Sequence, residues 1–387
     1  MAVELQFTPE QQRFRAEVRA WMQAHVPATP LKTLESEAGF AQHRQWERTL
    51  AAGNWGMITW PAQYGGRGAN LIEWLIFEEE YYRANAPLRV NQNGIFLLGP
   101  TLMEFGTPAQ KARFLPKMAA GEEIWAQGWS EPQAGSDLAA LRATAVRDGD
   151  SYVLRGHKIW SSRAAFADWC FCIFRTEEGS ERHRGLSFIL VPLRHPGVRV
   201  RGIRQIHGEP GFAEIFFEEA RVPVANRVGE AGAGWHIAMA TAGFERGLML
   251  RSPARFQVAA LKLVQLWRHH AEKADPALAS AVAQAWMDAQ AYALNTYRTA
   301  SRLMAGGSIG VEASLNKIFW SELDLNLHRT AMSLMGARAE LAPEAPDCTD
   351  PGWLEGFIFS LAGPVYAGTN EIQRNLIAER LLGLPRG

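Results

Sequence analysis

The sequence WCFCIF occupies residues 169–174, and a second apolar run, LSFILVPL, follows at residues 186–193. Both runs have the length and the β-branched and aromatic content of buried strands. Other short apolar or alternating runs lie around them, at residues 144–146, 152–154, 198–203 and 213–217. Regular short runs, punctuated by Gly, Pro, Asp and Ser, predict one compact barrel or sandwich of about 100 residues.

The segments on either side of these strands have helical spacing. Thr8, Pro9 and Glu10 supply an N-cap, a first helical residue and a first-turn acid, and residues 72–84 and 108–118 continue the pattern. Three later stretches are too long and too apolar for surface helices and predict a helical bundle; they span residues 235–266, 278–304 and 312–335. We therefore expect an α+β chain with a helical domain (1–121), a β domain (122–230) and a C-terminal helical bundle (231–387).

Length and composition narrow the function. A chain of 387 residues predicts two to three domains, and 47% apolar residues suffice for packed cores. The 40 basic and 40 acidic side chains cancel, which argues against a protein that binds nucleic acid by neutralising phosphates. Three cysteines cannot form a disulfide framework. Because no apolar run approaches the roughly 18 residues of a membrane span and the N-terminus is charged, we expect a cytoplasmic protein.

Several motif-like strings lack the context that their chemistry needs. Gly306-Gly-Ser-Ile-Gly310 matches the G-x-S-x-G nucleophile elbow but follows a helix, so it predicts an interhelical loop. His269 and His270 are adjacent and would point apart on a helix, and Cys170 and Cys172 have no second ligand pair. We expect no metal site. No Gly-x-Gly-x-x-Gly string lies between a strand and a helix, which disfavours a Rossmann nucleotide site.

Three strings are hard to explain as scaffold alone. They are QGWSEPQAGSD at residues 127–137, GHKIWSS at 156–162, and YAGTNEIQRNLIAER at 366–380. The small residues and hydroxyls of the first string would place backbone N–H groups and Ser130 or Ser136 against a polar ligand. A plain Gly- and Pro-rich turn stays an alternative for the first string.

Together these strings resemble the acyl-CoA dehydrogenase family over nearly the whole chain. The resemblance implies an N-terminal helical domain, a middle β-barrel domain and a C-terminal four-helix bundle, in the order that the periodicity predicts. It also implies an oxidoreductase that acts on a CH–CH group, with FAD as cofactor, an acyl-CoA thioester as substrate and an electron-transfer flavoprotein as oxidant. An oxidase on the same scaffold is an open alternative.

The resemblance carries over to individual positions. Gln127 and Ser130 match the segment that lies along the flavin ring, and Trp160 and Ser162 match the aromatic group and hydroxyl near flavin N5. Ser136 matches a contact to the CoA chain or its surroundings.

The C-terminal string contains the main departure from the family pattern. Thr369 and Glu371 match positions that approach the FAD diphosphate and adenosine. The residue before that Gly-Thr is a catalytic Glu in many members, but here it is Ala367, which cannot accept a proton and retains only its backbone N–H. A smaller group carries the Glu on the first long C-terminal helix, just before an Arg, and Glu245-Arg246 matches that arrangement.

Glu245 is therefore the expected base for the α-proton, with Arg246 holding the local geometry or charge. Glu245 and Ala367 should then face the same pocket. The alternative is that Glu245 only pairs with a neighbouring Arg.

Two further departures bear on assembly. The family's Arg-x-x-Phe-Gly stretch has no clear match, and its Gly-Gly-x-Gly reads Leu334-Met-Gly-Ala-Arg338. These features resemble the branch of pimeloyl-CoA dehydrogenase large subunits and steroid side-chain acyl-CoA dehydrogenases, whose members often form heterotetramers. A homo- or hetero-oligomer is expected, and a non-catalytic or half-site subunit is a second hypothesis. Short, branched, dicarboxylic and steroid acyl groups all remain open. Arg163 is also unusual, because a smaller residue is common there.

Overall fold

The structure is a computed structural model that describes residues 6–245, 252–270, 275–341, 345, 348 and 352–385. The chain divides into two compact units. The first, here called the helical unit, comprises Met1–Val26, Asn70–Ala86 and Arg246–Gly387. The second, the sheet unit, comprises Pro27–Ala69 and Pro87–Glu245. The three-domain boundaries expected from the sequence stay a prediction.

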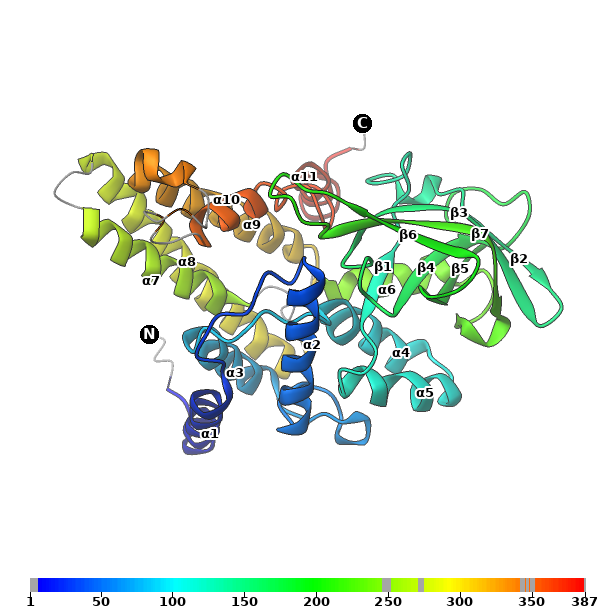
Figure 1. Ribbon diagram of the computed structural model, residues 1–387, viewed down its shortest axis with the longest axis horizontal. Coiled ribbons are helices and arrows are strands. Elements are labelled where there is room, and N and C mark those ends of the chain that lie inside the picture. Colours follow the sequence, from blue (N-terminus) through cyan, green and yellow to red (C-terminus); the bar gives the residue numbers. More distant parts are fainter. Residues whose placement is uncertain are drawn as a thin grey trace. The chain divides into compact units, whose positions relative to one another are not determined.

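The helical unit is built around the long helices α7, α8 and α9, which lie side by side in Figure 1. Their core contains Phe256, Tyr292, Trp320 and Leu327, and Trp353 packs into the same cluster. The helices of this unit are α1 (Pro9–His25), α3 (Leu71–Arg83), α7 (Pro253–His270), α8 (Pro276–Met304), α9 (Glu312–Met335), α10 (Gly352–Ser360) and α11 (Asn370–Leu376), with the short turns η6 (Gly336–Glu340) and η7 (Ile377–Leu381).

Local sequence explains where these helices begin and end. Thr8 caps α1, since its Oγ1 accepts from the Gln11 N–H while Gln11 Oε1 accepts from the Thr8 N–H. The G-x-S-x-G string lies between α8 and α9, which confirms an interhelical loop. The stretch 235–266, predicted as one helix, contains α6 and α7; residues 246–251 between them lie outside the described residues.

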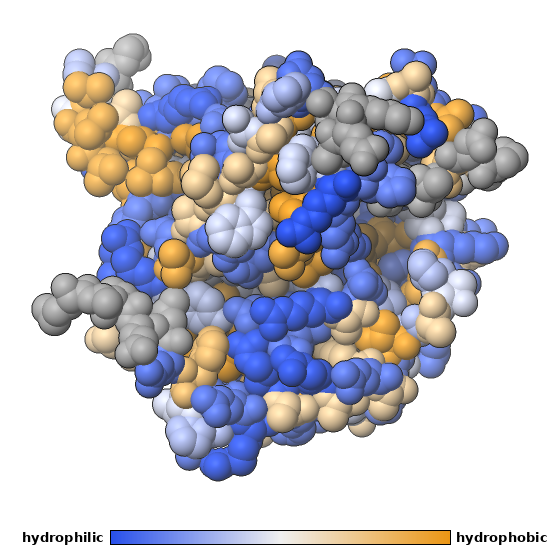
Figure 2. All heavy atoms as spheres, turned by 90° about the vertical axis from the view of Figure 1, so that its left-hand side faces the viewer, coloured by the Kyte–Doolittle hydropathy of each residue, from blue (hydrophilic) through white to orange (hydrophobic). Residues whose placement is uncertain are grey.

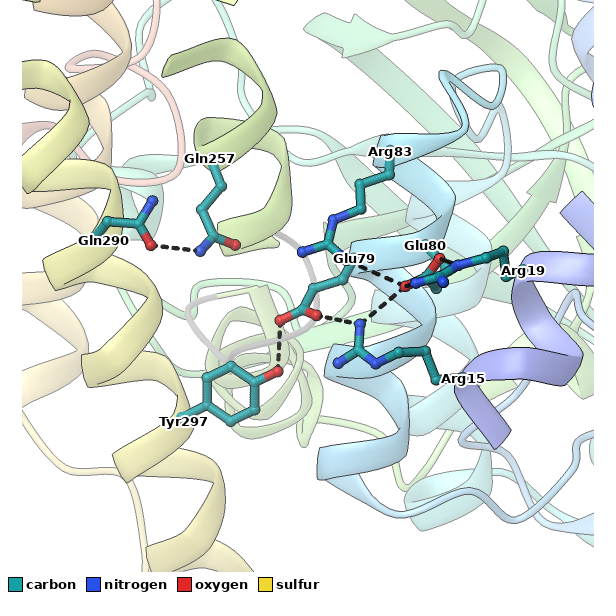
Figure 3. Close-up of polar contacts among 8 residues, drawn as sticks. All are labelled: Arg15, Arg19, Glu79, Glu80, Arg83, Gln257, Gln290 and Tyr297. Atoms are coloured by element: carbon teal, nitrogen blue, oxygen red, sulfur yellow. Dashed lines mark hydrogen bonds and ion pairs between the residues drawn. The ribbon is translucent and has the colours of Figure 1, made fainter. Parts of the chain in front are cut away.

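Charged side chains join α1, α3 and α8 within the helical unit. Figure 3 shows Glu79 and Glu80 of α3 facing Arg15 and Arg19 of α1. Arg15 Nη1 lies 2.7 Å from Glu79 Oε2 and 3.0 Å from Glu80 Oε1. From α8, the Tyr297 hydroxyl donates to Glu79 Oε1 at 2.6 Å. The three helices therefore share one partly buried polar network.

The sheet unit contains an eight-stranded sheet with the order β6-β7-β3-β2-β4-β5-β8 and β1 beside β4. Most neighbours are antiparallel, but β1 and β2 both run parallel to β4. The strands are β1 (Trp125–Gly128), β2 (Thr144–Asp148), β3 (Ser151–Ser162), β4 (Trp169–Arg175), β5 (Leu186–Pro192), β6 (Val198–Ile203), β7 (Phe212–Pro223) and β8 (Arg227–Val228). The helical elements are α2 (Glu37–Ala52), η1 (Ala62–Tyr64), η2 (Asn93–Leu98), α4 (Gly99–Phe105), α5 (Pro108–Ala119), η3 (Leu138–Ala140), η4 (Val224–Asn226) and α6 (Gly234–Glu245).

The WCFCIF run lies in β4, as predicted; residues 170–174 are buried, while Trp169 and Arg175 at the two ends are half-buried. Cys170 and Cys172 are both 0% exposed, and burial raises the pKa of the Cys170 thiol well above its usual value. Among the described residues, no group of His, Cys, Asp and Glu side chains is arranged to hold a metal ion. Nor does any helix in the described part of the chain combine the length and apolarity needed to cross a membrane.

Candidate active site

Gln127 and Ser130 lie at the edge of the sheet where β1 ends. β1 pairs with β4, so that Gln127 stands opposite Phe171, and the Ser130 carbonyl accepts a hydrogen bond from the Ile159 N–H at 2.9 Å. This bond brings the Ser130 loop next to the end of β3. The Gln127 and Ser130 side chains are half-buried, and neither makes a hydrogen bond to another described side chain or backbone group.

Trp160 and Ser162 lie at the C-terminal end of strand β3 in the same unit. The register with β7 shifts between Lys158 and Ser161, and Trp160 has φ +59°. This irregularity leaves 58% of Trp160 exposed, with its ring edge-on to Phe212 at 6.1 Å. The Ser162 side chain is half-buried, and its hydroxyl has no hydrogen-bond partner within the described residues. The sequence-predicted residues of β1 and β3 thus present an aromatic ring and unpaired polar groups.

Two residues missed by the sequence analysis lie beneath this surface. Lys158 is 0% exposed, and its Nζ lies 2.8 Å from Glu131 Oε1. Burial alone would raise the pKa of Glu131, but the Lys158 ammonium and the N–H groups of Arg142 and Ala143 outweigh it and hold the pKa below its usual value. A lysine in a strand pattern usually signals an exposed position, so the sequence carried no sign of this pair.

Ser136 and Arg163 differ from the residues above, because Ser136 is exposed and the Arg163 guanidinium is bound to the backbone. Ser136 is exposed in the loop after Glu131, where the neighbouring Asp137 binds Arg182 at 2.8 and 3.0 Å. The Arg163 guanidinium donates to the backbone carbonyls of Arg89 and Val90 at 3.1 and 3.2 Å. Arg163 therefore ties the end of β3 to the loop before η2.

The predicted substrate residue Ala367 and the predicted cofactor residues Thr369 and Glu371 belong to the helical unit. Ala367 has φ +56°, followed by Gly368 at +78°, and the Gly368 carbonyl accepts from Gln373 Nε2 at 3.3 Å. Thr369 is the N-cap of α11, where its Oγ1 accepts from the Ile372 N–H at 3.2 Å.

Buried polar groups hold this C-terminal turn in place. Asn370 is 2% exposed, and its Oδ1 accepts from Lys317 Nζ at 3.2 Å and from Ser321 Oγ at 3.1 Å. Glu371 is exposed, and hydrogen bonds from its own backbone N–H and from Thr369 lower the pKa of its carboxyl.

Glu245 is the last described residue of α6 (Gly234–Glu245), in the sheet unit. Its side chain and all of Arg246 lie outside the described residues, so the expected approach of Glu245 to the pocket of Ala367 stays a prediction. One turn earlier, Thr241 makes a buried hydroxyl–hydroxyl bond of 2.8 Å to Thr101 in α4. This bond fixes α6 against α4 just before the expected base.

Comparison with known protein families identifies the family to which the chain belongs. Residues 8–122 match the acyl-CoA dehydrogenase N-terminal domain, residues 126–220 the middle domain, and residues 232–382 the C-terminal domain. The chain belongs to the acyl-CoA dehydrogenase family. It is therefore an oxidoreductase of a flavoprotein family, and the N-terminal helical, middle sheet and C-terminal helical architecture predicted from the sequence is confirmed.

This acyl-CoA dehydrogenase is similar to other acyl-CoA dehydrogenases over nearly all of its length. It is 42% identical to acyl-CoA dehydrogenase IpdE1 of Mycobacterium tuberculosis, covering 97% of this chain and 98% of the relative. The solved Tcur3481-Tcur3483 steroid ACAD superposes with a TM-score of 0.89 at 28% identity, over 100% of both chains. The ChsE4-ChsE5 complex from M. tuberculosis gives a TM-score of 0.85 at 32% identity, again over 100% of both chains.

The residues of the sheet unit fit one part of a flavin. An isoalloxazine has flat apolar faces and an edge of hydrogen-bonding groups. Gln127, Ser130 and Ser162 offer half-buried donors and acceptors that no other described residue uses, and Trp160 offers an aromatic surface.

Proposed function

We propose that this chain catalyses the FAD-dependent α,β-dehydrogenation of an acyl-CoA thioester, with Glu245 as the base. The observation that carries the proposal is the set of unpaired polar groups on Gln127, Ser130 and Ser162 beside the exposed Trp160, in a chain that matches all three domains of the family. When bound, FAD supplies the acceptor for the hydride that leaves Cβ.

The protein's own residues provide position, hydrogen bonds and a base. Gln127, Ser130 and Ser162 hold the polar edge of the ring, while Thr369 and Glu371 approach the diphosphate and adenosine. A thioester α-proton is only weakly acidic, so its removal requires a carboxylate in a dry site and donors to the thioester oxygen.

The backbone at Ala367 suits the second of these requirements. Its N–H has no acceptor among the described residues, and the left-handed turn formed with Gly368 leaves that group available to a thioester oxygen. Because Ala367 has no carboxylate, the proton passes to Glu245 Oε instead.

A glutamine variant tests the base directly. Glu245→Gln should keep its flavin absorbance and lose most of the flavin bleaching that acyl-CoA causes in the wild type under anaerobic conditions. Glu230→Gln is the matched control, since its side chain is 95% exposed in the same unit, and it should bleach like the wild type. Undiminished bleaching in Glu245→Gln would remove Glu245 from the mechanism.

For the acyl group we propose a bulky, steroid-derived chain. A solved relative is named a steroid ACAD, and Ala367 is smaller than the Glu that many family members carry at this position, which leaves room beside the C-terminal turn. Flavin reduction should be compared across short, branched, dicarboxylic and steroid acyl-CoAs. A preference for short straight chains would contradict this part of the proposal.

A heteromeric assembly is supported by two observations. The Tcur3481-Tcur3483 and ChsE4-ChsE5 relatives are named as pairs of chains. The face drawn in Figure 2 shows hydrophobic residues grouped between hydrophilic ones, and within the helical unit Trp286, Met287 and Leu294 of α8 are 42–55% exposed. We propose that a second copy or a homologous chain covers such residues, and that an electron-transfer flavoprotein reoxidises the complex.

The half-site alternative is tested by flavin stoichiometry. If the chain is catalytically complete, it should purify yellow when expressed alone, with FAD bound in a stoichiometric amount, and substrate should bleach that flavin. A colourless chain that gains flavin and activity only with a homologous partner would establish the half-site subunit instead.

A further inference from the structure

Lys158 is one of the largest fully buried side chains of the described residues, and it carries a charge. Its Nζ donates to Glu131 Oε1 at 2.8 Å and to the Trp129 carbonyl at 3.2 Å, and it lies 5.4 Å from the centre of the Phe174 ring. Burying an ammonium is costly unless its hydrogen bonds are satisfied. The lysine therefore has a specific set of partners, and its two hydrogen-bond acceptors, Trp129 and Glu131, flank Ser130 in the sequence.

Glu131 is as fully bonded as its partner. Besides Lys158, its two carboxylate oxygens accept from the backbone N–H groups of Arg142 and Ala143 at 2.7 and 2.9 Å and from Gln133 Nε2 at 2.8 Å. The Glu131 side chain thus connects the loop after Ser130 with the segment directly before β2. A buried pair of this kind seldom adds more stability than apolar residues of the same volume, so its value lies in fixing one arrangement.

The arrangement that it fixes surrounds Ser130. The carbonyl before Ser130, that of Trp129, is bound by Lys158 Nζ, and the carbonyl of Ser130 itself is bound by the Ile159 N–H. The residue after Ser130 is Glu131. Two consecutive residues of β3 therefore hold the peptide groups on both sides of Ser130, and the residue that follows them on β3 is Trp160.

We propose that Lys158 is a positioning residue: through Glu131 and the Trp129 carbonyl it holds Ser130 and Trp160 in the fixed relation that flavin binding requires. This inference rests on the proposed function. Neither Lys158 nor Glu131 touches the ligand, and both act by keeping two ligand-facing segments from moving independently. Preorganisation of this kind raises affinity, because the segments need not be ordered on binding.

The test uses Lys158→Met, which keeps the length of the side chain and removes its charge and hydrogen bonds. Two readouts are needed: the FAD dissociation constant of deflavinated protein, and amide hydrogen exchange of the apoprotein. We expect at least tenfold weaker FAD binding and at least tenfold faster exchange at Ile159, Arg142 and Ala143. Arg155→Met is the control, because Arg155 lies on the same strand in an exposed ion pair with Glu219, and it should change neither readout.

A second variant separates positioning from the cost of an uncompensated charge. The double variant Glu131→Gln/Lys158→Met has no buried charge left at this pair, and it should fold while its FAD affinity and exchange rates stay impaired. Wild-type affinity and wild-type exchange in either variant would overturn the proposal, as would failure of both variants to fold. A wild-type protein that binds no FAD would count against the proposed function. Amide exchange at Ile159 is measured without flavin, so in that case it would still test whether Lys158 holds the Ser130 segment in place.

Discussion

Replacing Glu80 by glutamine should destabilise the helical unit far more than loss of a surface ion pair. The Glu80 side chain is 3% exposed, and its carboxylate accepts hydrogen bonds from Arg15, Arg19 and Arg83 (Figure 3). Arg19 binds both oxygens, through Nε at 2.8 Å and Nη2 at 2.9 Å. An amide would keep one acceptor and direct N–H groups at the arginines.

The magnitude follows from the exposure of each partner. Removing one member of a fully buried ion pair costs about 3–5 kcal/mol. Here the Arg19 and Arg83 side chains are 52% and 56% exposed, so water solvates them, and Arg15 retains Glu79. We therefore expect a loss of about 2–3 kcal/mol, or about 4–12 °C in Tm if the helical unit unfolds on its own.

The pH dependence gives this prediction a second readout. Burial alone would raise the pKa of Glu80, but the hydrogen bonds and charges of Arg19 and Arg15 outweigh it and lower the pKa from its usual 4.5. A carboxyl with a lowered folded-state pKa stabilises above its unfolded pKa and loses that effect as pH falls through the folded one. The Tm difference between wild type and variant should be full at pH 7 and should shrink below about pH 4.5.

Calorimetric Tm measurements from pH 7 down to pH 3.5 check both expectations. Arg13→Gln is the control, because Arg13 and Glu10 form an exposed pair on the same helix α1, with 71% and 70% of their side chains accessible. A Glu80→Gln variant that matches this control at pH 7, or that differs from wild type by the same amount at every pH, would refute the reasoning.

Two further substitutions test the C-terminal turn. Ala367→Gly should raise stability by about 0.5–1 kcal/mol in denaturant unfolding, because glycine adopts the left-handed backbone without a Cβ clash; a loss of stability would contradict the observed φ. Asn370→Ala should cost about 1–3 kcal/mol, since it removes the buried acceptor of Lys317 and Ser321. Asn375→Ala, at an exposed site on the same helix, should stay within about 0.5 kcal/mol of wild type, and equal effects at both positions would show that burial is not the cause.

Hydrophobic spacing predicted the apolar elements well and the amphipathic ones only in part. α9 spans Glu312–Met335 and β6 spans Val198–Ile203, as the sequence predicts, because Gly and Pro end these elements locally. β3 and β7 extend well beyond their apolar runs, to Ser151–Ser162 and Phe212–Pro223. Their outer parts carry cross-strand ion pairs, such as Arg155 with Glu219, which look like loop residues in a single sequence.

The resemblance assigns site residues where they lie in contiguous strings. Gln127, Ser130, Trp160 and Ser162 belong to two short motifs, and their roles stay predictions. The buried charge of Lys158 does not follow from either motif, because its carboxylate partner lies 27 residues away in the chain and only the fold buries both. Long-range burial of a charge leaves no local signal in composition or spacing.

Two of the residues assigned to the site from the sequence have a strained backbone. Trp160 and Ala367 both have positive φ, a conformation that costs a non-glycine residue of order 1 kcal/mol and persists only where its surroundings determine it. Lys158, two residues before Trp160, is anchored by Glu131 and the Trp129 carbonyl. Near Ala367, the buried Gln373 donates to the Gly368 carbonyl, and the buried Asn370 accepts from Lys317 and Ser321. Buried polar anchors that do not contact ligand in the proposed mechanism thus lie next to both strained positions. Because an anchor's loss lets the strained residue relax, substitutions at these anchors should change cofactor geometry before they unfold the surrounding sheet or bundle.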